Sequence, residues 1–209
     1  MIAESYYIMP AYAYLSPREA LPPEKAAVQK ALTIDPSLAE AHTALASILS
    51  YYDWNWVEAE CEFKWAIELD PNSSASHYRY GQHLVAIGRM DESIAELKHA
   101  LELEPLSNNS GANLAIVYSY ARKNEQALEQ AKKTYDLEPN FVNGRLVLGV
   151  VYNGNRLYDD AIRLSENSLH TEPTNQFMLW IGGYAYAKSG RRREAEEFIN
   201  RSGGRVCDV

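Results

Sequence analysis

Apolar residues recur along this chain at helical rather than strand spacing. The run from Ile94 to Leu103 places its apolar side chains three or four residues apart, which is the period of one face of an α-helix. The pair Glu104-Pro105 closes the run. Because proline cannot continue a helix and pushes the residue before it out of the helical region, the pattern predicts a helix that ends there.

The pair of an acidic residue and a proline recurs with a nearly constant period. Successive prolines of these pairs lie 35, 34, 34 and 34 residues apart. The pairs are Asp35-Pro36, Asp70-Pro71, Glu104-Pro105, Glu138-Pro139 and Glu172-Pro173. Self-similarity at such a period is the signature of a repeat array, in which each unit buries its apolar face on its neighbours. The sequence therefore predicts one all-α array rather than separate globular domains.

Each interval between prolines is interpreted as two helices joined by a short turn. Asp91 and Asp159 end two of these polar turns and are predicted to cap the second helices. A small polar residue follows most of the prolines, as at Ser37 and Asn72, and is predicted to cap the next helix. The predicted hairpins span approximately residues 3–38, 39–73, 74–107, 108–141, 142–175 and 176–202, with 203–209 as a tail.

When the intervals are aligned on their prolines, small residues fall into columns. Two helices can cross closely only where neither side chain is bulky, so these columns are predicted to mark the helix crossings. The column in the first helices holds Ala46, Gly81, Ala115, Gly149 and Gly183, and a column in the second helices holds Ala59, Ser93, Ala127, Ala161 and Ala195.

The two ends of the chain depart from the pattern. Pro10 predicts a first helix that is kinked or begins late. The segment Ser16-Pro-Arg-Glu19 is predicted to start a helix with a capping box, and Leu21-Pro22-Pro23 is predicted to interrupt the chain before the helix that carries Ala31. The last helix is predicted to stop near Ser202 without a closing proline, which would leave an apolar end in water. A cut from a longer protein is the favoured explanation, with a folded-back tail or pairing with another copy as alternatives.

Composition and charge narrow the range of functions. Hydrophobic residues make up 46% and charged residues 23% of the chain, which is typical of a folded protein, and the formal net charge of -8 disfavours direct nucleic-acid binding. The N-terminus does not resemble a signal peptide, and no apolar run is long enough to predict a membrane span. Cys61 and Cys207 form no disulfide framework, so a reducing, cytoplasmic location is predicted.

No catalytic, cofactor-binding or metal-binding residue is predicted. The five histidines are scattered, and neither they nor the two cysteines have the spacing of a zinc site. The chain has no glycine-rich phosphate loop and no serine in a nucleophile elbow. We therefore expect a protein that is not an enzyme.

The 34-residue period, the small residues at the crossings, the tyrosines and the closing proline resemble the tetratricopeptide repeat (TPR), from about Ala3 to about Arg201. A narrower segment, Tyr52-Asp-Trp-Asn-Trp-Val-Glu-Ala-Glu-Cys-Glu-Phe63, is similar to segments of TPR arrays at the C-terminal end of multidomain bacterial signalling proteins. That similarity implies a fragment or a relative of such a protein. Trp54 and Trp56 are predicted to pin the longer turn of the second hairpin onto its neighbour.

The resemblance to the TPR family implies a right-handed α-solenoid of about six antiparallel hairpins, whose first helices line a concave groove for a peptide or protein partner. Carried over by column, the groove candidates are Tyr78, Arg79, Gln82, Asn109, Asn113, Tyr120, Asn143 and Asn153. An aromatic group near the C-terminal end is interpreted in two ways, as part of the groove or as a packing surface through which two copies form a homodimer. Its members are Phe177, Trp180, Ile181 and Tyr184.

Overall fold

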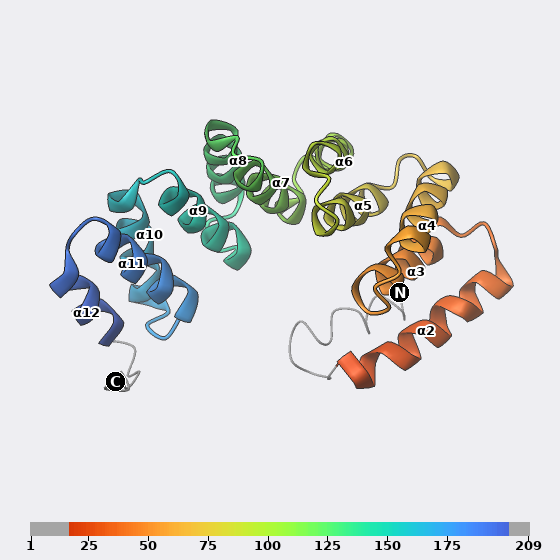
Figure 1. Ribbon diagram of the computed structural model, residues 1–209, viewed down its shortest axis with the longest axis horizontal. Helices are drawn as coiled ribbons and strands as arrows, with labels where there is room; N and C mark the ends of the chain where they lie inside the picture. Colours follow the sequence, from red (N-terminus) through yellow and green to blue (C-terminus); the bar gives the residue numbers. More distant parts are fainter. Residues whose placement is uncertain (1–16, 201–209) are drawn as a thin grey trace. The chain divides into compact units, whose positions relative to one another are not determined.

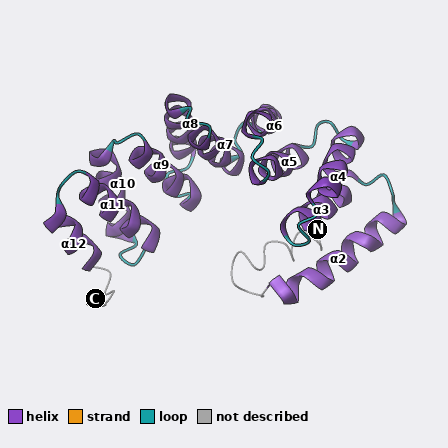
Figure 2. Cartoon of the chain, in the orientation of Figure 1, coloured by secondary structure: helices purple, strands orange, loops and turns teal. Residues whose placement is uncertain are grey.

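The computed structural model describes residues 17–200, with side chains from residue 21 onward (Figure 1). All regular secondary structure in this range is helical (Figure 2), which confirms the predicted all-α fold class. The chain divides at Pro105 into two compact units, which we describe separately. The predictions about the helix around Pro10, the cap at Ser16 and the end of the chain after residue 200 lie outside the described residues.

Consecutive helices of the first unit pack as hairpins, α3 against α4 and α5 against α6. A core cluster of Ala46, Phe63, Tyr80 and Leu84 joins the two hairpins. α2 packs against α3 at the N-terminal side. The helices are α2 (Pro17–Ile34), α3 (Ala39–Tyr51), α4 (Trp56–Leu69), α5 (Ser74–Ala86) and α6 (Met90–Leu103).

The second unit repeats the same arrangement. α7 packs against α8, α10 against α11, and α9 contacts α7, α8, α10 and α11. Its core cluster includes Ala161, Ile162, Met178, Ile181 and Ala185. The helices are α7 (Asn108–Tyr120), α8 (Asn124–Leu137), α9 (Val142–Gly154), α10 (Tyr158–Thr171), α11 (Gln176–Lys188) and α12 (Arg192–Asn200).

The columns of small residues lie at the helix contacts. Ala46, Ala59 and Ala127 are completely buried. A Cβ atom added at Gly149 would lie 2.6 Å from Cδ1 of Ile181, so the glycine allows α9 and α11 to approach closely. The small residues therefore act as spacers that set the distance between helices.

Each acidic–proline pair folds the chain into a turn before the next helix. The Oδ1 atom of Asp70 accepts a hydrogen bond from the backbone N–H of Asn72 at 3.1 Å, and the N-cap of α5 is Ser73, whose side chain accepts from the N–H of Ser76. The prediction that Asn72 and Ser37 are caps was wrong by one residue. The aspartate side chain holds the residue after the proline inside the turn, and the helix begins only after it.

The turn inside each described hairpin contains one residue with a left-handed backbone. Trp54 has φ 55°, Arg122 and Arg156 have φ 59°, and Gly88 and Gly190 have φ 82°. These residues occupy equivalent positions 34 residues apart. Glycine adopts this conformation without steric strain, whereas a residue with a Cβ atom is destabilised by about 1–2 kcal/mol.

The predicted caps of the second helices were also displaced. α6 and α10 begin one residue before Asp91 and Asp159, and their N-cap residues are Arg89 and Leu157, whose side chains make no capping hydrogen bond. Because the left-handed residue ends the first helix so abruptly, the second helix starts two residues after it. Asp91 and Asp159 lie in the first turn instead, where a negative charge interacts favourably with the helix dipole.

The predicted interruption at Leu21-Pro22-Pro23 was wrong. α2 is one helix from Pro17 to Ile34 with both prolines inside it. The fixed φ of proline is itself helical, so Pro22 and Pro23, the sixth and seventh residues of α2, fit its backbone. Each of them lacks an N–H and removes one hydrogen bond from the helix, a loss that packing further along α2 offsets. Burial of Val28 further along α2 anchors the helix on its neighbours.

The longer turn of the second hairpin is not pinned by its tryptophans, contrary to the prediction. The side chains of Trp54 and Trp56 are 70% and 42% exposed, and their ring centroids lie 6.2 Å apart. The turn is held instead by an ion pair between Lys25 Nζ and Asp53 Oδ1 at 2.6 Å and by a hydrogen bond from Asn55 N–H to the carbonyl of Leu49 at 2.9 Å.

Candidate functional site

The three groove candidates of α5 form one cluster. Gln82 Nε2 donates a hydrogen bond to the Tyr78 hydroxyl at 3.0 Å, and Arg79 Nη1 donates to Gln82 Oε1 at 3.2 Å. The guanidinium carbon of Arg79 lies 5.5 Å from the centroid of the Tyr78 ring. All three side chains are half-buried. The fold therefore places a phenol, a guanidinium and an amide in a mutually supported arrangement on one surface of the first unit.

A buried carboxyl group belongs to the same unit and was missed in the sequence. Glu24 on α2 is only 1% exposed, and its Oε2 atom has no hydrogen-bond partner. Burial raises the pKa of Glu24 to about 7, and the charge of Arg79 opposes this rise. A signal was available, because Glu24 stands 35 residues before Ala59, in the column that elsewhere holds only small residues.

Polar side chains also join α3 to α5. The hydroxyls of Thr43 and Ser76 are 2.8 Å apart, and the Ser50 hydroxyl lies 2.8 Å from Nδ1 of His83. His83 is completely buried and its Nε2 atom has no partner, so burial lowers the pKa of this imidazole. These contacts fix the alignment of the two hairpins in the first unit.

Amide and phenol groups lie on one face of α7 in the second unit. Asn109, Asn113 and Tyr120 are spaced four and seven residues apart, which places them on the same side of the helix. Asn109 and Tyr120 are exposed, and the Nδ2 atom of Asn113 donates to the carbonyl of Asn109 at 3.0 Å. On α9 the predicted candidate Asn143 is also exposed.

The prediction for Asn153 does not fit the structure. This side chain is buried, and its Nδ2 atom donates to the backbone carbonyl of Ile181 at 3.1 Å. It therefore ties α9 to α11 rather than facing a partner. The error arose because an amide satisfies a buried backbone carbonyl as readily as it satisfies a peptide ligand.

The aromatic residues of α11 form an exposed surface. Phe177, Trp180 and Tyr184 are 57%, 56% and 41% exposed, and the ring centroids of Trp180 and Tyr184 lie 6.3 Å apart. Ile181 is not part of this surface, contrary to the prediction, because it is completely buried against Gly149. The helical period explains this difference, since Ile181 lies one residue, or about 100°, beyond Trp180 around the helix.

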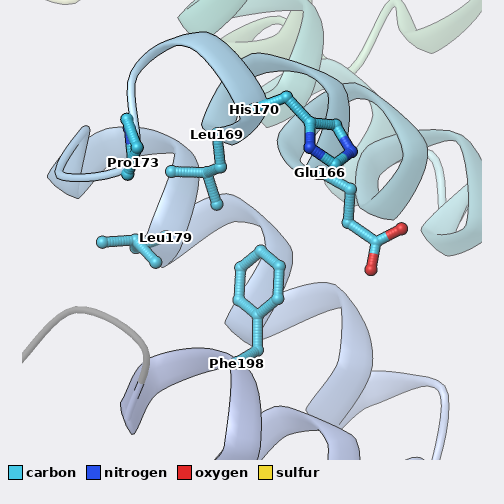
Figure 3. Close-up of a pocket in the computed structure, with 6 residues that line it drawn as sticks. All are labelled: Glu166, Leu169, His170, Pro173, Leu179 and Phe198. Atoms are coloured by element: carbon cyan, nitrogen blue, oxygen red, sulfur yellow. The ribbon is translucent and has the colours of Figure 1, made fainter.

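A small cavity lies between α10, α11 and α12 (Figure 3). Its volume is about 280 Å³, and Figure 3 shows Leu169, Leu179 and Phe198 converging on it, with Glu166 to one side. Glu166 Oε1 already accepts a hydrogen bond from the Tyr186 hydroxyl at 2.7 Å. The cavity is slightly smaller than the roughly 300–1,000 Å³ of typical small-molecule sites. It was not predicted from the sequence.

Among the described residues, no group of three or more histidine, cysteine, aspartate or glutamate side chains is arranged to hold a metal ion. No helix in the described part of the chain is both long and apolar enough to cross a membrane.

Comparisons with known proteins relate this geometry to a repeat family. Residues 55–108 match the tetratricopeptide repeat model. No curated protein sequence matches the chain. Among solved structures, one from a functional characterisation of Pseudomonas aeruginosa pilF is 26% identical, covers 94% of this chain and 88% of its own, and has a TM-score of 0.72.

Two further solved structures share the fold. YrrB, described as a TPR protein with an unusual peptide-binding site, is 20% identical over 84% of this chain and 90% of its own, with a TM-score of 0.65. MamA is 20% identical over 75% of this chain and 91% of its own, also with a TM-score of 0.65. The fold of the chain is therefore that of TPR solenoids.

Proposed function

We propose, from the match of residues 55–108 to the tetratricopeptide repeat and from the fold around it, that this chain is a non-enzymatic scaffold that binds an extended peptide or protein segment. TPR proteins generally mediate protein–protein interactions, and TPR scaffolds are generally not enzymes. The proposal names two candidate binding surfaces, on α5 and on α7, and a cellular location for the scaffold.

The cluster on α5 is the observation that carries the proposal. Tyr78, Arg79 and Gln82 orient one another through two hydrogen bonds and a cation–π contact before any partner arrives, so little side-chain entropy would be lost on binding. A guanidinium supplies donors and an amide supplies both a donor and an acceptor, which suits the N–H and C=O groups of an extended peptide. The YrrB structure, described as having a peptide-binding site, supports this assignment by fold.

The face of α7 offers a second surface of the same chemistry. Asn109, Asn113 and Tyr120 present amide and phenol groups, and Asn143 on α9 adds another exposed amide. None of these side chains carries a charge, so this surface suits main-chain recognition rather than a charged tail.

We place the scaffold in the bacterial cytoplasm, as a module of a larger signalling or regulatory protein. The similarity of the segment from Tyr52 to Phe63 to segments of such proteins supports this setting. Genomic sequence on both sides of the coding region tests it. A reading frame that continues into a kinase, cyclase or winged-helix domain supports the proposal, and a stop codon directly upstream contradicts it.

Peptide selection tests the binding surface on α5. Peptides enriched from a random displayed library on the wild-type chain are measured by fluorescence anisotropy against Tyr78→Ala/Gln82→Ala. Loss of the phenol and the amide is expected to weaken binding at least about tenfold, which corresponds to about 1.4 kcal/mol. Asn167→Ala, an exposed position on α10, is the control and should bind as the wild type does.

The same selection can contradict the proposal. Equal binding by the wild type and Tyr78→Ala/Gln82→Ala, together with unchanged binding by Asn113→Ala, would show that neither surface holds the peptide. Circular dichroism melts of each variant confirm that the fold is retained.

A second candidate function is homodimerisation through α11. The exposed surface of Phe177, Trp180 and Tyr184 favours it, because clustered exposed aromatic side chains mark interaction sites. Sedimentation equilibrium of the wild type and of Trp180→Glu tests it. A wild-type dimer that becomes a monomer in the variant supports the idea, and a wild type that is monomeric at high concentration contradicts it.

A further inference from the structure

The second hairpin carries an exposed apolar surface that the proposed function does not use. We call it the tryptophan face and define it as Trp54, Trp56, Val57, Cys61 and Trp65. On α4, Val57 is 79% exposed and Trp65 is 48% exposed, while Trp56 begins this helix and Trp54 lies in the turn before it. Cys61 is exposed as well. Large apolar side chains gathered in this way on the outside of a fold mark an interaction surface.

The face lies on the side of α4 that points away from the core. Val57, Cys61 and Trp65 follow one another every four residues, which aligns them along one side of the helix. The buried residues of α4, Ala59 and Phe63 among them, lie on the opposite side. Within the hairpin, Trp65 contacts the ring of His42 on α3 edge-on, with the ring centroids 6.5 Å apart, and about half of its surface remains exposed.

The other hairpins serve as internal controls for this interpretation. At the position of Val57 they carry Asp91, Glu125 and Asp159. At the position of Trp65 they carry His99, Lys133 and Asn167. The same fold is thus built three more times with polar residues at these positions. The hairpin fold therefore does not require valine and tryptophan at these positions.

The turn before α4 presents Trp54 at the expense of backbone strain. Trp54 has a φ of 55°. At the equivalent position the third hairpin has Gly88 and the last described hairpin has Gly190. The turn is nevertheless held in place, because Asp53 is bound to Lys25 and Asn55 is bound to Leu49. An exposed aromatic side chain on a fixed backbone loses little entropy when it is buried by a partner.

The acidic side chains beside the stripe favour a partner with positive charge. Glu58 and Glu68 lie on the exposed side of α4, and the side-chain partner of Glu58 is the neutral amide of Asn55. Of the other acidic groups of the helix, Glu60 is paired with Lys64 and Arg89, and Glu62 lies 2.6 Å from Nδ1 of His42. The tryptophan face is therefore an apolar surface beside uncompensated negative charge. Two copies paired through it would bring like charges together.

We propose that the tryptophan face docks a basic amphipathic helix of another protein. Apolar residues of that helix would cover Trp54, Val57 and Trp65, and its lysine or arginine side chains would reach Glu58 and Glu68. Recognition of an amphipathic helix by an apolar stripe is an established mode of peptide binding. This surface is separate from the cluster on α5, so the chain would hold two partners at once.

Designed peptides test the proposal directly. The probe is a labelled helical peptide of leucine and lysine, about five turns long, with its leucines on one face. We expect it to bind the wild-type chain with a dissociation constant of about 10–100 μM, measured by fluorescence anisotropy. A peptide with glutamate in place of every lysine is the charge control and should not bind. Failure of the leucine–lysine peptide to bind the wild type overturns the proposal.

A paired variant separates the apolar stripe from general charge attraction. Val57→Asp/Trp65→Lys introduces the residue types found at Asp91 and Lys133 and leaves the net charge unchanged. We expect the leucine–lysine peptide to bind this variant at least about tenfold more weakly. Asn167→Ala, at the position equivalent to Trp65, is the control and should bind normally. Equal affinity for the paired variant and the wild type overturns the proposal, because attraction would then depend only on the negative charge of the chain.

Cys61 provides a readout at the surface itself. Its exposed thiol lies between Val57 and Trp65 on the stripe, so a docked helix would cover it. Saturating leucine–lysine peptide is expected to slow alkylation of Cys61 at least about fivefold, as followed by mass mapping of the wild-type protein. An unchanged alkylation rate in a sample where anisotropy shows binding would place the peptide elsewhere and overturn the proposal.

Discussion

Replacing Glu24 by glutamine is expected to stabilise the first unit, and the gain is expected to grow with pH. Glu24 is buried, its Oε2 atom lacks a partner, and its pKa is raised to about 7. The folded chain therefore keeps this proton at pH values where the unfolded chain, with a carboxyl pKa of 4.5, has released it. Stability falls as pH rises from 4.5 towards 7, because folding then requires the carboxyl group to take up a proton. Glutamine resembles the protonated carboxyl and has no proton to lose.

The size of the effect follows from the two pKa values. Moving a carboxyl pKa from 4.5 to about 7 destabilises the folded state by about 3 kcal/mol above pH 7, at about 1.4 kcal/mol for each pH unit. At pH 5 the unfolded carboxyl is only just ionised, and the penalty is about 1 kcal/mol. The advantage of Glu24→Gln should therefore be about 2–3 kcal/mol larger at pH 8 than at pH 5.

Urea unfolding followed by tryptophan fluorescence measures this difference. Trp54, Trp56 and Trp65 belong to the first unit, so a Trp180→Phe background removes the signal of the second unit. Glu24→Gln is compared with Glu24 in that background at pH 5 and pH 8. Other groups titrate equally in both proteins and cancel in the comparison.

Asp35→Asn is the matched control. Hydrogen bonds from Ser37 lower the pKa of Asp35, so this carboxyl is ionised in both folded and unfolded chains across the same pH range. Its effect on stability should be the same at pH 5 and pH 8. If Glu24→Gln also showed an equal effect at the two pH values, the reasoning from burial of Glu24 would be refuted.

Three further predictions concern other positions. Gly149→Ala is expected to destabilise the second unit by about 1–2 kcal/mol, because the new methyl group would lie 2.6 Å from Ile181. Gly154→Ala in the same helix meets no atom within 4 Å and should stabilise the unit by up to about 1 kcal/mol. Urea unfolding of both variants measures the two effects. Trp54→Gly should stabilise the first unit by up to about 1 kcal/mol by relieving the left-handed backbone, and should weaken binding of the leucine–lysine peptide; a lower melting temperature would contradict this. Burial lowers the pKa of His83, so on acidification the unfolded chain protonates this imidazole before the folded chain does, and stability falls. His83→Val should therefore reduce the loss of stability between pH 7 and pH 5, which thermal melts at the two pH values measure.

The period of the sequence was sufficient to predict the fold class. Proline ends a helix for reasons local to the backbone, so five evenly spaced prolines indicate repeated helices without any knowledge of tertiary contacts. Helix starts were predicted less accurately. Ser37 and Asn72 are plausible caps in isolation, but the preceding aspartate folds them into a turn, and that competition is decided by side-chain geometry.

The candidate site was predictable only in part. Column positions put Tyr78, Arg79 and Gln82 in one set, and their side chains do contact one another, because residues three and four apart lie on the same side of a helix. The same reasoning failed for Asn153 and Ile181, whose burial depends on how closely the neighbouring hairpin approaches. An alignment column shows which residues are equivalent, but it does not show how much of each side chain a neighbouring hairpin buries.

The contacts between α3 and α5 bear on how such a chain can change length. Arrays of this kind grow and shrink when a whole repeat is duplicated or lost, and uniform apolar columns would tolerate such events anywhere. If residues 74–107 were deleted, Ser110 would replace Ser76 opposite Thr43, and a hydroxyl pair would survive. Val117 would replace His83 opposite Ser50, however, and the serine hydroxyl would be buried against a methyl group. These polar contacts thus match each hairpin of the first unit to one particular neighbour. They specify the order of the hairpins as well as their fold.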